Sequence, residues 1–211
     1  MINKERLLTK AEKKRQELFL KKSEELEKQG YTPKELTVNI KILNVFSLIL
    51  TVVYMAVCFM IYATVNRGGE KFYELEFGEL LIFLVAMAIL MVLHEGIHGL
   101  TWGIFAEQHF KDIEFGFIKE YVTPYCYCRS PLKKYQYIIG TLMPMILLGV
   151  IPSIVAICLN SNVVLFLSCV MFGSAGGDIM VTIKIILNKV NASAVLYCDH
   201  PTEPGLVVFE K

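Results

Sequence analysis

Four long apolar runs constrain this chain more than any other feature of its sequence. A helix needs about 20 apolar residues to cross about 30 Å of hydrocarbon, and each run is long enough. The runs are residues 43–65, 80–106, 137–159 and 163–187. Composition agrees, because 55% of the 211 residues are hydrophobic and 19% are charged, whereas soluble domains average about 25% charged residues. The sequence therefore predicts an all-α membrane protein with four transmembrane helices.

The runs divide the chain into three parts. Residues 1–42 are polar and rich in Lys and Glu, which predicts a solvent-exposed helix over about residues 4–29 and argues against a cleaved signal peptide. Residues 43–190 form the four-helix core. Residues 191–211 form a short tail, in which a turn precedes one short strand at residues 206–209.

The longest loop between the runs, residues 107–136, predicts a β-hairpin. Ile113, Phe115 and Phe117 alternate with other residue types, and this period of two is typical of a half-buried strand. Residues 123–129 form a second extended segment. Two roles are open for this hairpin. It could pair with an extended substrate segment as an added strand, or it could lie at the membrane surface with its aromatic residues at the interface.

Lys and Arg residues set the predicted orientation, because they accumulate in cytoplasmic loops. Most of them lie in residues 1–42 and 107–136, whereas the loop 66–79 has two and the turn 160–162 has none. We therefore expect a multi-pass protein of the cell membrane with both termini and the hairpin in the cytoplasm. The net charge of +1 gives no reason to expect a nucleic acid as a partner.

The second apolar run contains a motif of ionisable residues, His94-Glu95-Gly96-Ile97-His98. Residues four apart lie on one face of a helix, so both imidazoles can bind one Zn²⁺ while Glu95 reaches a water molecule on that ion. A charged side chain at the middle of a membrane costs about 2.5–3.5 kcal/mol on the insertion scale, so residues kept there indicate function. The motif predicts that His94 and His98 are metal ligands.

Asp178 in the fourth run is the best candidate for the third ligand that a catalytic zinc requires. With the predicted orientation, Asp178 and His94 both lie about fifteen residues below the outer membrane surface, at one depth, and no helix needs to bend. Glu107 and His109 lie beyond the end of the motif helix, and His200 lies in the tail. These three residues are therefore weaker candidates.

This constellation predicts hydrolysis of a peptide bond, with a zinc-activated water and Glu95 as general base. The expected partners are the lipid bilayer and a membrane-associated protein or peptide substrate, and no feature sets an oligomeric state. Glycines precede Asp178, and small residues let transmembrane helices approach closely. Cys126 and Cys128 are candidate soft metal ligands, although we favour the interpretation that they are ordinary strand residues.

The motif helix and the later intramembrane Asp resemble the site-2 protease class of intramembrane metalloproteases. The chain more closely resembles the bacterial "putative zincin peptidase" family. The matching stretches are residues 94–99, Pro144, residues 174–178, residues 30–31 and residues 199–201. The resemblance implies that His94, His98 and Asp178 bind zinc and that Glu95 is the catalytic base.

The chain also departs from the site-2 protease pattern. Ile179 follows Asp178 where that class has glycine, and the usual Asn-Pro pair is missing. There is no room for a PDZ-like domain, so substrate selection must differ. Two other classes of function remain open: a membrane transporter or metal-binding protein that uses the same polar cluster as an ion or proton pathway, and a scaffold with a vestigial site.

Overall fold

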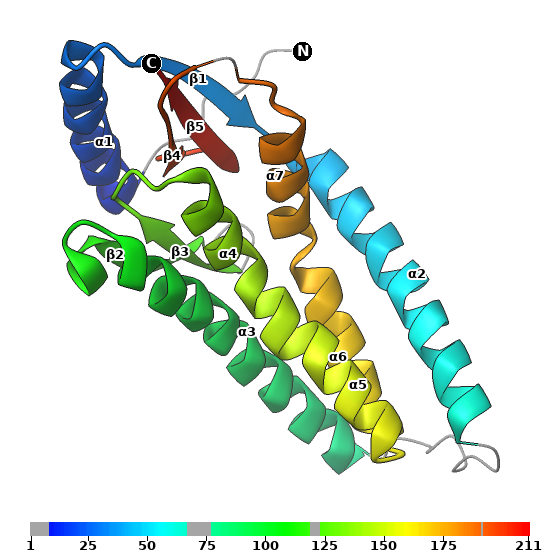
Figure 1. Cartoon of the computed structure of the whole chain (residues 1–211). Coiled ribbons are helices and arrows are strands. Elements are labelled where there is room, and N and C mark those ends of the chain that lie inside the picture. The colour runs from blue at the N-terminus through cyan, green and yellow to red at the C-terminus, as the bar shows by residue number, and fades with distance from the viewer. Residues whose placement is uncertain (1–8, 67–76, 119–122, 191) are drawn as a thin grey trace, which may run out of the picture.

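The computed structural model describes residues 9–66, 77–118, 123–190 and 192–211 of the chain (Figure 1). Three of the described helices are long and apolar enough to cross a membrane: α2 (Ile40–Val65), the segment Leu80–Phe105 of α3 (Phe77–Phe105), and the interrupted helix Lys134–Cys158. The helices α6 (Asn162–Ser174) and α7 (Gly176–Leu187) form a fourth span if the bent pair counts as one. The four predicted runs are therefore all helical.

The third run is interrupted by a π-helical turn. It consists of α4 (Lys134–Pro144), the π-helix η2 (Met145–Val150) and α5 (Ile151–Cys158). Proline has no N–H, and its ring clashes with the carbonyl of residue i−4 in a regular α-helix. Pro152 lies in the first turn of α5, and the wide π turn before it relieves that clash.

The fourth run is bent by 45° at the break between α6 and α7, at Ala175. The expectation that no helix needs to bend was therefore wrong. Gly173 and Gly176 flank the break, and kinks occur where such small residues leave the backbone free to turn. Both α6 and α7 also pack against α2, so the whole bent run stays in contact with that helix.

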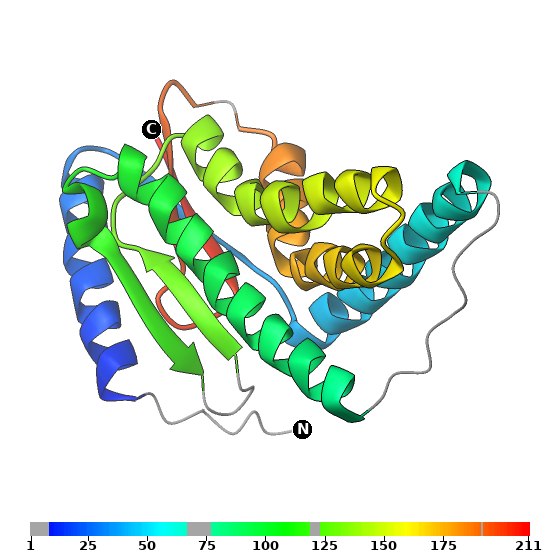
Figure 2. The ribbon, with the colours of Figure 1, turned by 90° about the horizontal axis from the view of Figure 1, so that it is seen from below.

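The bent pair α6–α7 lies between α2 on one side and the α4–α5 run on the other, as Figure 2 shows from below. Helix α3 packs chiefly on α4. Because α4 contacts both α3 and α7, the motif helix α3 lies close to α7. This arrangement brings the second and fourth apolar runs together.

Two small antiparallel sheets lie at one end of the helices (Figure 1). The predicted hairpin is confirmed: β2 (Ile113–Ile118) pairs with β3 (Thr123–Cys128) after the short 3₁₀ helix η1 (His109–Asp112). The other sheet has the order β1-β5-β4. Its strands are β1 (Thr32–Thr37), β4 (Val195–Asp199) and β5 (Gly205–Glu210). The predicted strand 206–209 lies in β5, whereas β1 and β4 were not predicted.

Helix α1 (Lys10–Lys28) packs on both sheets. Leu26 joins Cys198, Val207 and Phe209 in one buried cluster. The Arg15 guanidinium lies over the Tyr125 and Tyr127 rings of β3, at 4.6 and 5.0 Å from their centroids. The sequence predicts an exposed helix over residues 4–29, and most of its surface is exposed, but one side is covered. Residues 4–8 of that prediction lie outside the described residues.

A larger buried cluster joins the ends of α3, α4 and α7 to the three-stranded sheet. Its members are Trp102, Ala106, Cys128, Leu132, Tyr137, Ile185, Tyr197, Leu206 and Val208. Burial of apolar side chains is the main favourable term in folding. This cluster therefore fixes the three helices relative to the sheet, directly beside the residues of the motif.

Candidate metal centre

The two histidines of the motif meet at their Nε2 atoms. His94 and His98 lie one helical turn apart on α3, and their Nε2 atoms are 3.2 Å apart. Both side chains are buried, with 4% and 3% of their surface exposed. Two adjacent polar rings in an otherwise apolar helix need a common partner, because unpaired buried polar groups cost free energy.

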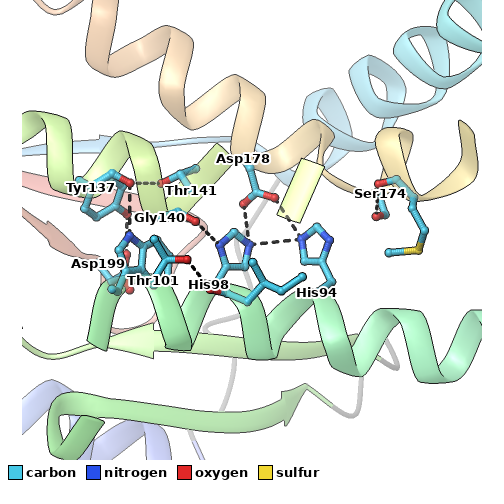
Figure 3. Close-up of polar contacts among 12 residues, drawn as sticks. His94, His98, Thr101, Tyr137, Gly140, Thr141, Ser174, Asp178 and Asp199 are labelled. Carbon is cyan, nitrogen blue, oxygen red and sulfur yellow. Dashed lines mark hydrogen bonds and ion pairs between the residues drawn. The ribbon is translucent and has the colours of Figure 1, made fainter. Parts of the chain in front are cut away.

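Asp178, in the first turn of α7, supplies that partner (Figure 3). Its Oδ2 atom lies 3.2 Å from His94 Nε2, and its Oδ1 atom lies 3.5 Å from His98 Nε2. The three side chains offer ligand atoms that all lie within 4.8 Å of one another. The structure therefore brings together the three residues that the sequence predicts as metal ligands, although their role as ligands remains a prediction.

These residues fit a zinc ion. With Zn–N bonds of 2.0–2.1 Å, neighbouring ligand atoms in a tetrahedral site are about 3.3 Å apart, close to the separations above. His98 Nδ1 lies 2.8 Å from the carbonyl oxygen of Gly140 and must donate to it, so in the neutral ring His98 Nε2 carries a lone pair. That lone pair faces His94 Nε2 and a carboxylate. A shared cation relieves the repulsion among them.

The surroundings of His98 fix the direction of its ring. The Trp102 ring stacks on it, at 4.9 Å between centroids and 15° between planes. The indole Nε1–H of Trp102 donates to the carbonyl oxygen of Tyr137, at 3.2 Å. A hydrogen bond to the second nitrogen of a metal-binding imidazole selects its tautomer and orientation. His94 Nδ1, by contrast, has no hydrogen-bond partner among the described residues.

Glu95 lies beside the three candidate ligands but outside their group, and its role as general base remains a prediction. Its side chain is partly buried, and the backbone N–H of Cys126 on β3 lies within hydrogen-bonding reach of its carboxyl group. Strand β3 packs along α3, so the hairpin borders the site. The Asp178 side chain is 23% exposed, whereas those of His94 and His98 are buried.

A comparison with protein-family models matches residues 87–193 to the family described as "Putative zincin peptidase". The chain belongs to this family. A search of curated proteins and a search of solved structures each gave no match. The matched region of this zincin family member contains the whole motif and Asp178, whereas α1, β1, β4 and β5 lie outside it.

The other candidates lie elsewhere in this zincin family member. Glu107 pairs with Lys22 of α1 at 3.4 Å, and His109 lies in η1. His200 Nδ1 accepts hydrogen bonds from backbone N–H groups in the turn between β4 and β5. Cys126 and Cys128 are strand residues, and neither belongs to a metal-type cluster in the described chain.

The residues that hold His98 were not predicted from the sequence. Gly140 acts through its carbonyl oxygen, and every residue type offers a carbonyl, so no sequence signal could identify it. Trp102 lies four residues after His98, so their shared helix face was visible in the sequence. An aromatic residue at that spacing, however, is equally typical of a packing residue.

Proposed function

We propose that this protein is a zinc-dependent intramembrane endopeptidase that cleaves membrane-associated protein or peptide substrates. One observation carries the proposal: His94, His98 and Asp178 converge within an apolar helical core, with the carboxyl group of Glu95, which is not one of the candidate ligands, beside them. Membership of the zincin family supports it. Three ligands leave one position open for water or substrate, as catalytic zinc requires.

Each residue of the site would have a separate role in the proposed hydrolysis. When bound, zinc would activate a water molecule and polarise the scissile carbonyl group. Glu95 would take a proton from a water molecule at the site and deliver it to the leaving amine. His94, His98 and Asp178 would hold the metal, and the Gly140 carbonyl oxygen fixes the His98 ring so that its Nε2 atom lies toward His94 and Asp178. The apolar walls exclude bulk water, which strengthens each of these electrostatic contacts.

The orientation proposed from the sequence agrees with the arrangement of the elements. Helix α1 and both sheets lie at the same end of the helices (Figure 1), and α1, β1 and the hairpin belong to residues 1–42 and 107–136, which carry most of the Lys and Arg residues. We propose a multi-pass protein of the cell membrane with both termini in the cytoplasm.

The hairpin is the proposed element that receives the substrate. Among the described strands β3 pairs only with β2, and its backbone N–H at Cys126 is directed at Glu95. The N–H groups of Cys126 and Cys128 on this edge are engaged by Glu95 and Asp199. An extended peptide would therefore bind to the carbonyl groups of the edge, and it would pass next to the general base. The alternative, a hairpin that only lies at the membrane surface, predicts that changes on β3 leave cleavage unaffected.

The first experiment compares Glu95→Gln with the wild type in cells and with purified protein. We expect membrane-protein substrates to accumulate uncleaved, while the variant still binds one zinc ion, because Glu95 is not a ligand. His98→Ala and Asp178→Ala should lose both zinc and cleavage. Proteomics of membranes and elemental analysis provide the two measurements.

Glu107→Gln is the matched control, because this carboxyl group lies just past the end of α3 and pairs only with Lys22 in the described structure. It should behave as the wild type does. If no protein accumulates and the purified wild type cleaves no membrane peptide, the protease proposal is wrong. Zinc binding without cleavage would then favour the transporter or metal-binding alternative.

A further inference from the structure

Asp199, the last residue of β4, is a buried carboxylate that the proposed chemistry does not use. Only 9% of its surface is exposed. Its Oδ2 atom accepts a hydrogen bond from the backbone N–H of Cys128 at 2.8 Å, and its Oδ1 atom accepts one from the Tyr137 hydroxyl at 2.5 Å. One side chain of the C-terminal sheet is thus bonded to two other elements, β3 and α4.

The hydrogen bond between Asp199 and Tyr137 connects Asp199 to the surroundings of His98. Gly140, whose carbonyl oxygen accepts from His98 Nδ1, lies three residues after Tyr137, one turn further along α4. The carbonyl oxygen of Tyr137 also accepts the indole N–H of Trp102, whose ring stacks on His98. Figure 3 shows Tyr137 and Gly140 on the same helix beside His98. Any movement of this turn of α4 therefore moves both contacts of the His98 ring.

The hydrogen bond between Asp199 and the Cys128 N–H connects Asp199 to the surroundings of Glu95. Cys126 lies two residues before Cys128 on β3, so their backbone N–H groups are directed to the same side of the strand. The N–H of Cys128 meets Asp199, and the N–H of Cys126 lies within reach of the Glu95 carboxyl. Asp199 therefore fixes the position of β3 along α3 at the point where it contacts the general base.

We propose that Asp199 is a positioning residue that aligns His98 through Tyr137 and Glu95 through Cys128. The proposal rests on the proposed function, because it concerns the same site. The residue lies outside the region matched by the family model. A buried carboxylate is costly unless it is paired, and an apolar side chain would pack this position at lower cost. The two directed bonds supply what an apolar side chain cannot.

The test measures zinc affinity by competition with a chromophoric chelator, using detergent-purified full-length protein. Asp199→Ala removes both bonds, and Tyr137→Phe removes only the bond to α4. We expect both variants to bind zinc about 10- to 100-fold more weakly, the usual effect of losing a partner outside the ligands themselves. Cobalt(II) loaded in place of zinc should also show altered visible absorption bands, because the direction of the His98 ring changes.

His200→Ala is the matched control. It removes a side chain next to Asp199 that holds the turn between β4 and β5, but that does not contact β3 or α4 in any described hydrogen bond. It should keep wild-type zinc affinity and cobalt spectrum. If Asp199→Ala does not fold, Tyr137→Phe decides alone the part of the inference that concerns His98. Zinc affinities and spectra equal to those of the control overturn this inference and leave the protease proposal intact, whereas a wild type that binds no zinc overturns both.

Discussion

Asp199 and His200 are neighbours whose pKa values are displaced in opposite directions. Burial raises the pKa of the Asp199 carboxyl to about 6, although the N–H of Cys128 and the Tyr137 hydroxyl stabilise its charge. Burial lowers the pKa of His200, whose Nδ1 accepts hydrogen bonds from the N–H groups of Thr202 and Glu203 and is therefore held neutral. The two residues should make opposite contributions to stability as pH changes.

For Asp199, the unfolded pKa is about 3.9. Between about pH 4 and pH 6 the folded protein binds a proton that the unfolded chain does not, so the contribution of Asp199 to stability falls as pH rises through 6. The loss is on the order of 2–3 kcal/mol at neutral pH. For His200 the contribution is complete above about pH 6.5 and is lost as pH falls below that value.

Thermal unfolding of chelator-treated protein from pH 4.5 to 8 measures both effects. The melting temperature of the wild type relative to Asp199→Ala should fall as pH rises, and relative to His200→Ala it should fall as pH decreases. In each comparison the wild type and the variant share the charged neighbours of the replaced residue. These are Arg15 and His98 for Asp199, and Glu35 and Glu203 for His200. Two difference curves of the same sign would contradict this account.

The candidate ligands could be predicted from the sequence, whereas their supports could not. His94 and His98 follow from helical spacing, and Asp178 follows from a comparison of depths in two apolar runs. Asp178 does lie beside the two histidines, although the prediction assumed an unbent fourth helix, because the bend lies only three residues before Asp178. Asp199 lies in a tail without periodicity, and its partners, a backbone N–H and a tyrosine hydroxyl, are brought to it only by the tertiary fold.

The approach of α7 to α2 depends on one glycine. A Cβ atom on Gly176 would lie 2.1 Å from Ser47 Oγ and 2.8 Å from Ser47 Cα, so the two helices would have to separate. We expect Gly176→Ala to destabilise the protein by about 1–3 kcal/mol, the usual cost of overpacking. Because Asp178 is two residues further on the same helix, zinc affinity should fall as well.

Gly177→Ala provides a control one residue away. Its Cβ would meet only Leu43, at 3.6 Å, which is ordinary van der Waals contact. Alanine is favoured over glycine in a helix by about 1 kcal/mol, so this variant should be as stable as the wild type or more stable. Melting temperatures in detergent compare the pair. Equal destabilisation by both changes would show that helix flexibility, and not contact with α2, is the reason for these glycines.

Elements with a strong pattern in their own sequence were predicted, and those defined by partners were not. The four apolar runs are long and uniformly apolar, the hairpin β2–β3 has a period of two in its first strand, and each is found within a few residues of its predicted bounds. Strand β1 is polar and contains Pro33, which is typical of an edge strand and gives no alternating pattern. It is a strand because β5 pairs with it, with Lys34 opposite Val208.

The two ends of the helix bundle carry different structural elements. The described end near the termini carries α1 and both sheets, whereas α5 and α6 at the opposite end are joined by a short turn (Figure 1). Lys184 of α7 donates a hydrogen bond to the Thr37 carbonyl oxygen of β1, so the three-stranded sheet also holds the helix that carries Asp178. The sheets, α1 and the site therefore form one unit on the proposed cytoplasmic side.

Cysteine labelling in intact cells tests that orientation. Leu159, in the turn between α5 and α6, is 73% exposed, and Lys28 at the end of α1 is also exposed. With Cys158→Ser as background, a membrane-impermeant maleimide should label Leu159→Cys in intact cells and Lys28→Cys only after permeabilisation. Background labelling should be low, since the four cysteines at positions 58, 128, 169 and 198 are buried, and labelling of the half-buried Cys126 is measured in the Cys158→Ser parent. The reverse pattern would place the sheets outside the cell, and the site would then receive its water and its substrate from the opposite side of the membrane.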